Sequence, residues 1–193
     1  MGVQMSYELY SRFFVFIIIF LLFFGLSYSE EISAIEFVQD NFRLFSEIPS
    51  LQDLWVSIDN TLATINPDDL DFDWEEMNQK AETLLKKSNK LLIHFGEDLK
   101  SVDKILSEKE LKKLESFLKQ LSIYLDVVDR AIMKRVVIIN RLYKMTKDPD
   151  SYTMKEYLED IDIYNKLMEE YKKEGAKLNR ELEELRFMKI VIK

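Results

Sequence analysis

The chain has 193 residues, no cysteine and a formal net charge of −8, with 35 acidic against 27 basic side chains. An acidic chain is a poor partner for nucleic acid or anionic lipid, and without cysteine it has no disulfide, thiolate metal site or lipid-modified cysteine. One histidine and the lack of a glycine-rich phosphate loop also argue against a histidine-based metal cluster and a nucleotide-binding loop.

Residues 13–26 are apolar or glycine throughout. As a helix this run spans roughly 21 Å, which is short for a bilayer core of about 30 Å and typical of a secretory signal. Small residues follow it, so we expect cleavage between Ser29 and Glu30, with an uncleaved signal-anchor as the alternative. Arg12 before the run and acidic residues after it place the rest of the chain outside the cytoplasm in either case.

We therefore expect residues 1–29 to be a signal peptide or signal-anchor and residues 30–193 to be one extracytoplasmic domain, whether periplasmic, cell-surface or secreted. The domain is long enough for a substantial core. Its prolines fall at the edges of periodic segments, which is typical of a helical chain with few breaks. Short and medium helices are expected over 30–106, and a long antiparallel hairpin over 107–193.

The first helical pattern covers residues 31–47, and Pro49 is expected to end it because a residue before proline disfavours helical geometry. Ser50 is then expected to cap a second helix that ends before Pro67. The apolar stripe of that helix comprises Leu51, Leu54, Trp55, Ile58, Leu62 and Ile65.

Asp73 is expected to cap the next helix, whose apolar stripe leads to Gly96 as a helix end. A short helix would follow over 97–106, although the chain could instead continue through 96–107 as one longer helix. Asp69, Asp71 and Asp73 alternate as calcium ligands do. The glycine and final glutamate of an EF-hand loop are missing, so we interpret these residues as a solvated loop with helix-start acids.

The longest pattern starts after a capping box at Ser107 and forms a five-heptad seam that Pro149 ends. Its two rows are Leu111, Leu118, Leu125, Ile132 and Ile139, and Leu114, Leu121, Val128, Arg135 and Leu142. Further apolar residues between 123 and 139 indicate contact with more than one neighbouring helix. A capping box at Thr153 opens the last helix, whose main row is Tyr157, Tyr164, Tyr171, Leu178 and Leu185.

Four amphipathic arms with short links predict an all-α, elongated up-down bundle with a coiled-coil-like C-terminal hairpin. The charge distribution supports the hairpin independently. Residues 130–147 contain six bases and no acid, and residues 156–170 contain six acids and one base. An antiparallel hairpin places these two blocks side by side, where complementary pairs favour the correct orientation.

Arg135 lies on an inner row of the seam. Its long side chain can reach outward to solvent. Alternatively, it forms a buried ion pair with Asp162 or Glu169 that fixes the register of the hairpin.

Tyr157, Tyr164 and Tyr171 stand seven residues apart on one face of the last helix. They are either seam residues with rings in the core and hydroxyls in water, or a contact strip for a partner or a second copy. We expect truncation of Tyr157, near the turn, to cost little stability, and truncation of Tyr171, beside Gly175, to cost much more.

The C-terminal sequence RFMKIVIK is richer in β-branched residues than the helix before it. We favour a frayed last turn that packs on the bundle. The alternative is an extended tail that adds a strand to a partner.

No paired titratable groups with an orienting neighbour can be located, so we expect neither enzymatic activity nor a cofactor or metal. His94 is interpreted as a histidine at a helix C-terminus. The expected function is a non-enzymatic protein-interaction or structural module that engages a protein partner or itself, without nucleic acid. Membrane contact is expected only through residues 13–26, if they are not cleaved. The alternative is a ligand-binding or chaperone-like bundle that uses an inter-helix groove.

Overall fold

The computed structural model describes residues 31–65 and 72–192. The expected signal segment, its cleavage site at Ser29 and Glu30, and Asp69 and Asp71 of the acidic loop lie outside these residues. Within them the secondary structure is almost entirely helical, which confirms the all-α class. None of the described helices is long and apolar enough to cross a membrane.

The described chain begins with a short strand, β1 (Glu31–Ser33), and a short helix, α2 (Ala34–Asn41). Four long helices follow: α3 (Leu44–Thr64), α4 (Trp74–Ile105), α5 (Glu108–Met145) and α6 (Met154–Leu185). A 3-10 turn (Pro149–Ser151) joins the last two helices, and strand β2 (Lys189–Val191) comes after α6.

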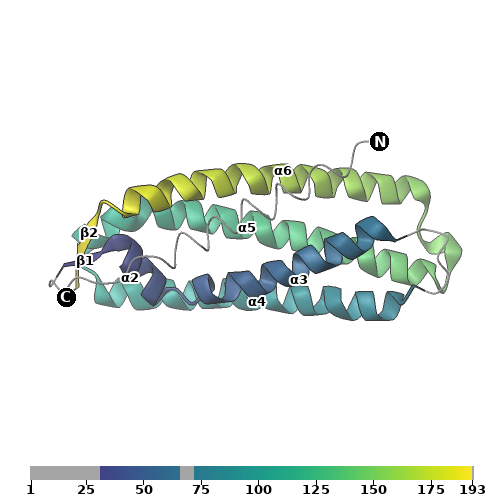
Figure 1. Cartoon of the computed structure of the whole chain (residues 1–193), viewed down its shortest axis with the longest axis horizontal. Coiled ribbons are helices and arrows are strands. Elements are labelled where there is room, and N and C mark those ends of the chain that lie inside the picture. The colour runs from purple at the N-terminus through teal and green to yellow at the C-terminus, as the bar shows by residue number, and fades with distance from the viewer. Residues whose placement is uncertain (1–30, 66–71, 193) are drawn as a thin grey trace.

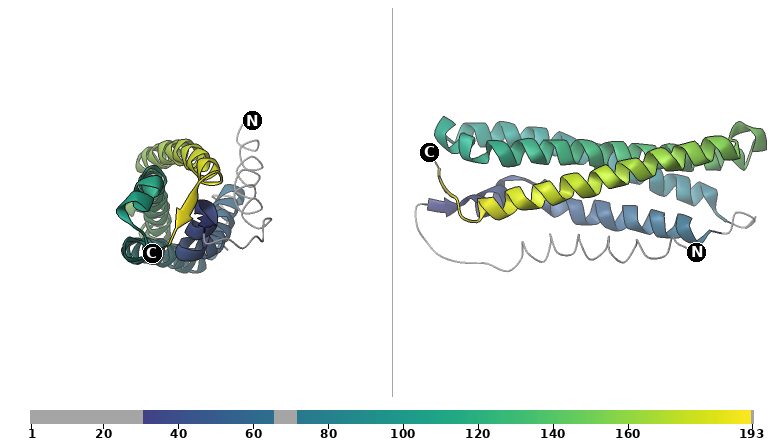
Figure 2. Two further views of the ribbon diagram at one scale, coloured as in Figure 1. Left: turned by 90° about the vertical axis from the view of Figure 1, so that its left-hand side faces the viewer. Right: turned by 90° about the horizontal axis from the view of Figure 1, so that it is seen from above.

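The four long helices run alongside one another in alternating directions, so the molecule is elongated (Figure 1). Each packs on the next in sequence: α3 on α4, α4 on α5, and α5 on α6. Viewed end-on, they surround a common interior (Figure 2). This arrangement is the one that short links between amphipathic arms favour, because each apolar stripe is buried against its neighbour.

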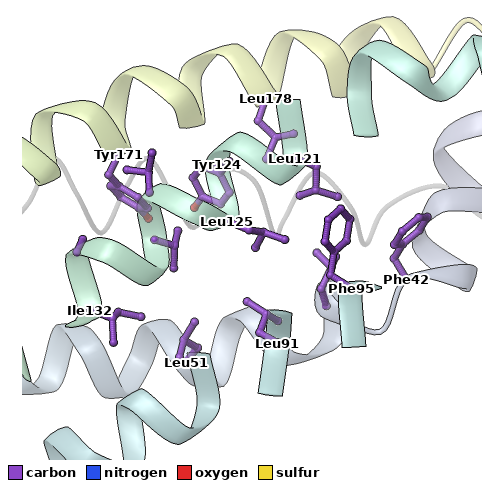
Figure 3. Close-up of a cluster of buried hydrophobic side chains, with 14 of the residues drawn as sticks. Phe42, Leu51, Leu91, Phe95, Leu121, Tyr124, Leu125, Ile132, Tyr171 and Leu178 are labelled. Atoms are coloured by element: carbon purple, nitrogen blue, oxygen red, sulfur yellow. The ribbon is translucent and has the colours of Figure 1, made fainter. Parts of the chain in front are cut away.

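Side chains from all four long helices fill the interior (Figure 3). The α5 seam supplies much of it: Leu114, Leu121, Leu125, Val128, Ile132 and Ile139 are buried. The additional apolar residues Val127, Val136 and Ile138 are buried as well, whereas Met133 and Val137 are exposed. Since α5 packs against both α4 and α6, the prediction that this helix has more than one neighbour is confirmed.

The predicted helix starts are observed. The Asp73 carboxylate accepts a hydrogen bond from the Glu76 backbone N–H at 2.8 Å, and the Ser107 hydroxyl accepts one from that of Glu110 at 3.3 Å. Thr153 and Glu156 form a reciprocal capping box. These motifs involve residues three apart, so their geometry follows from local sequence.

The predicted break at Pro49 is wrong. The chain breaks instead at Phe42, whose backbone is extended, and Pro49 lies within the early turns of α3. Asp98 of α4 holds the start of α3: its carboxylate accepts from the Arg43 backbone N–H at 2.9 Å and from Arg43 Nε at 2.8 Å. A proline near a helix start removes only one internal hydrogen bond, and here the long-range cap and the burial of Leu44 outweigh that loss.

The predicted helix end at Gly96 is also wrong, because α4 continues through it to Ile105. Phe95, Asp98 and Val102 extend the buried face beyond the glycine. Glycine costs about 1 kcal/mol in a helix interior, which is less than the burial of this face provides. The alternative, in which the helix continues past Gly96, is observed as far as Ile105; Leu106 is extended, and α5 begins at Glu108.

The C-terminal segment is extended rather than a frayed helical turn. β2 pairs antiparallel with β1, with Ile190 opposite Ile32, so the strand is added within the chain itself and not to a partner. Ile190 is buried, and the Ala34 N–H donates to the Met188 carbonyl at 3.0 Å. The two ends of the described chain meet here because α6 returns to the end of the bundle where β1 lies (Figure 1).

The facing charge blocks of the hairpin are confirmed. Arg130 forms an ion pair with Glu170 at 2.8 Å. The buried carboxylate of Asp160 contacts Lys134 Nζ at 2.5 Å and Arg141 Nη1 at 2.7 Å, and it also accepts from the Tyr152 hydroxyl at 2.7 Å. Asp160 therefore links α5, the turn and α6 at one point.

Candidate functional site: a buried polar and aromatic cluster

Arg135 is buried, and its partner lies on a different helix from the one predicted. Its Nε is 2.7 Å from Oδ1 of Asp59 on α3. Asp162 instead pairs with Lys166 on the surface of α6, and Glu169 is exposed. Both the outward-reaching interpretation and the pairing with Asp162 or Glu169 are therefore wrong. The pair ties α5 to α3, which are not consecutive in the chain.

Tyr164 completes this cluster. Its hydroxyl donates to Asp59 Oδ2 at 2.8 Å and accepts from Trp55 Nε1 at 2.9 Å. The Arg135 guanidinium carbon lies 4.0 Å from the centre of the Tyr164 ring, which is a cation–π distance. We call these four residues, Trp55, Asp59, Arg135 and Tyr164, the polar cluster.

The contact between Arg135 Nε and Asp59 Oδ1 is an ion pair without an aligned hydrogen bond, because neither atom has a hydrogen-bond partner in the described structure. Burial opposes the charge of Arg135, but Tyr164 and Asp59 outweigh it and raise the Arg135 pKa. Burial and the Asp59 charge raise the pKa of Tyr164 above its ordinary value. Arg135 therefore stays charged and Tyr164 stays protonated at neutral pH.

Aromatic rings extend the cluster along the bundle. The Tyr171 ring centre is 5.6 Å from that of Trp55 and 5.5 Å from that of Tyr124. A Cβ at Gly175 would lie 3.4 Å from the Tyr124 ring, an ordinary van der Waals distance, so the α6 backbone packs directly beside this ring. Figure 3 shows Tyr124 and Tyr171 lying together beside Leu125.

A small cavity lies between these rings and Leu51 and Leu91. The volume open to the centre of a water molecule is about 10 Å³, which is room for about one water.

No protein-family model, curated protein or solved structure matches this chain. A general acid or base needs a pKa near neutral pH, and the raised pKa values of Tyr164, Tyr171 and Arg135 move these groups away from it. The arrangement is suited to fixing the relative positions of α3, α5 and α6, as buried polar groups do in other bundles.

The three tyrosines predicted as one row have different environments. Tyr164 and Tyr171 are buried by helices of this chain, while Tyr157 is half-buried and its ring packs edge-to-face on Tyr152 at 6.2 Å. The Tyr164 hydroxyl is bound inside the bundle rather than reaching water. Tyr164 and Tyr171 therefore belong to the core and not to an exposed strip.

Replacing Tyr171 with alanine should lower the free energy of unfolding by roughly 2–4 kcal/mol, because it removes a buried ring that contacts Trp55 and Tyr124. The matched change Tyr157→Ala should cost less, since that ring is already partly in water. Urea unfolding followed by circular dichroism measures both. Equal and small losses at the two positions would contradict this placement.

His94 lies within α4 and not at a helix end. Its Nδ1 is 2.9 Å from Glu47 Oε1 on α3, so it contributes to packing between these helices. In the described ranges, 31–65 and 72–192, there is no group of three or more potential metal-ligating side chains. Asp73, the described member of the alternating aspartates, serves as the N-cap of α4.

Sequence reasoning missed Asp59 and Trp55 as members of the cluster. Asp59 directly follows Ile58 of the α3 stripe, and its side chain is 15% exposed. A charged residue at the edge of an apolar stripe indicates that its side chain belongs to a buried ion pair. It does not identify the partner, because Arg135 and Tyr164 are far away in sequence.

Proposed function

We propose that this protein is an exported or membrane-tethered, non-enzymatic helical bundle that acts as a protein-interaction or structural module in the cell envelope or outside the cell. The observation that carries the proposal is an uncovered stripe on the outer face of α5. Its members follow helical spacings of three and four: Ile123, Asp126, Arg130, Met133 and Val137.

The apolar members of this outer stripe, Ile123, Met133 and Val137, are 39%, 50% and 38% exposed. They stand on the same helix as the buried seam but belong to neither of its rows. Single exposed apolar residues are ordinary. Three on one face of a helix offer a surface to one further helix, in the way that an amphipathic helix docks on another.

The outer stripe is also self-complementary. If two copies of α5 lie antiparallel and are centred between Asp126 and Arg130, each Asp126 faces an Arg130, and each Ile123 faces a Met133. Within one chain Arg130 already pairs with Asp126 and with Glu170, both at 2.8 Å, so the Asp126 of a second copy would join an existing group of ion pairs. A two-fold interface requires this kind of complementarity of one surface with itself. The sequence therefore supports self-association through α5 in addition to binding of a different protein.

The alternative of a ligand-binding or chaperone-like groove has less support. The cavity beside Tyr124 and Tyr171 has room for about one water molecule, whereas sites for small molecules occupy about 300–1,000 Å³. The polar cluster is enclosed by its own contacts and presents no convergent polar groups to a ligand.

The test is a charge substitution in the outer stripe. Full-length protein carrying Met133→Lys and Val137→Lys is compared with wild type by cross-linking in the native envelope and by sedimentation of the purified protein. The control is Ile93→Lys on α4, where the side chain is 61% exposed and lies apart from the outer stripe. We expect the cross-linked product or oligomer to be lost in the double variant and retained in the control.

Circular dichroism melting shows whether the bundle is intact in each variant. A monomeric wild type without cross-linked products would overturn the proposal. The same products from the double variant would show that a different surface binds.

A further inference from the structure

One end of the bundle carries a group of exposed apolar side chains. Phe187, in the turn after α6, is 88% exposed, and Val191 and Ile192, at the end of β2, are 50% and 40% exposed. We call these three residues the apolar tip. Phe187 is more exposed than any other large apolar residue of the described chain.

β1 lies at the same end of the bundle (Figures 1 and 2). It begins at Glu31, five residues after Leu26, the last residue of the apolar run 13–26. A chain spans at most about 3.3–3.6 Å per residue, so Glu31 lies within about 18 Å of Leu26. If a bilayer holds residues 13–26, the end that carries the apolar tip is therefore held close to the membrane surface.

The opposite end of the bundle lies too far from Glu31 to be held at the membrane by the same tether. α6 has 32 residues and separates the two ends by about 48 Å. The 3-10 turn and the start of α6 lie at that far end (Figure 1). A tether at Glu31 therefore holds the end with the apolar tip nearer to the membrane than the end with the 3-10 turn can be held.

The backbone around the apolar tip is already hydrogen-bonded. Lys113 Nζ donates to the Lys189 carbonyl at 2.7 Å, and the Val191 N–H donates to Glu110 Oε2 at 3.4 Å. These are groups on the edge of β2 that faces away from β1. Unpaired backbone groups are costly in the less polar layer of a membrane, and these two are paired, by side chains that also form an ion pair with each other at 2.7 Å.

We propose that the apolar tip inserts into the interfacial layer of the bilayer that holds residues 13–26, so that the bundle stands on the membrane with its 3-10 turn pointing outward. This inference rests on the membrane-tethered form of the proposed function, in which residues 13–26 remain as the signal-anchor that is the alternative to cleavage between Ser29 and Glu30. The inserting side chains Phe187, Val191 and Ile192 carry no charge, and the exposed Lys189 stands between them in sequence, with Arg186 directly before them. Aromatic and aliphatic side chains are the ones that peripheral segments bury at the headgroup boundary.

The test uses the cysteine-free sequence, in which single cysteines can be introduced without removing others. Spin labels are attached to Phe187→Cys and Ile192→Cys in the full chain, reconstituted in phosphatidylcholine vesicles. The matched control is Met154→Cys at the other end, where the side chain is 70% exposed. Collision with oxygen, which concentrates in lipid, is compared with collision with a water-soluble nickel complex.

We expect the ratio of oxygen to nickel collisions to be several-fold higher at positions 187 and 192 than at 154. Equal ratios at all three positions in a tethered protein would overturn the inference. So would protection of positions 187 and 192 from both probes, because a protein partner would then cover the tip.

The tether itself is measured separately by alkaline carbonate extraction and by the mass of the mature chain. Release by carbonate, or a first residue at Glu30, would overturn this inference while leaving an exported interaction module intact. Retention by the membrane combined with equal collision ratios would leave the tether intact and overturn the tip contact alone.

Discussion

Replacing Arg135 with methionine should lower the free energy of unfolding by about 3–5 kcal/mol, because removal of one member of a buried ion pair leaves the other charge unpaired. Asp59 would keep its hydrogen bond from Tyr164 but lose the guanidinium 2.7 Å from Oδ1. Methionine fills a similar volume, so the cost comes from the charge and not from a cavity. Urea unfolding at neutral pH measures the loss.

The matched control is the double variant Arg135→Met with Asp59→Leu. Because it removes both charges, we expect it to recover most of the lost stability, and a double-mutant cycle then gives the coupling between the two residues. If Arg135→Met alone is neutral, the Asp59 carboxylate has access to water and the polar cluster does not act as an ion-paired unit.

Asp160→Asn should be the second large effect, with a loss of about 3 kcal/mol of unfolding free energy. The Asp160 carboxylate is buried and receives contacts from Lys134, Arg141 and Tyr152. The amide keeps the shape of the side chain but removes the charge that both bases face. The control is Glu170→Gln, whose exposed pair with Arg130 lies in the same hairpin and should be worth less than about 1 kcal/mol.

The pH dependence of this effect has a definite sign. Burial opposes the charge of Asp160, but hydrogen bonds from Lys134 and Tyr152 and the Arg141 charge outweigh it and lower the Asp160 pKa. A carboxyl with a lowered pKa in the folded state stabilises fully above its unfolded pKa, about 3.9, and loses that contribution as pH falls through the folded value. The difference between wild type and Asp160→Asn should therefore be constant near neutral pH and shrink below about pH 4. A difference that grows on acidification would contradict the assignment.

The sequence by itself determined the features that depend on nearby residues or on a repeating pattern. The caps at Asp73, Ser107 and Thr153 follow from side chains that reach a backbone N–H three residues away. The rows of α5 and α6 follow from helical periodicity, which forces apolar residues onto one face. The opposed charge blocks of the hairpin could also be predicted, because consecutive antiparallel helices meet in a register that the turn between them fixes.

Only the tertiary structure decided the features that depend on which distant groups come together. Asp98 moves the first helix break from Pro49 to Phe42, although local preference at the proline favoured a break there. Asp59 is the partner of Arg135 because α3 and α5 face one another across the interior, a relation that periodicity within either helix does not contain. β2 is extended because α6 returns its end to β1, where pairing with another strand and contacts from Glu110 and Lys113 replace the hydrogen bonds of a helical turn. In each case the deciding contacts join residues far apart in sequence, so the partners are known only once the helices are packed.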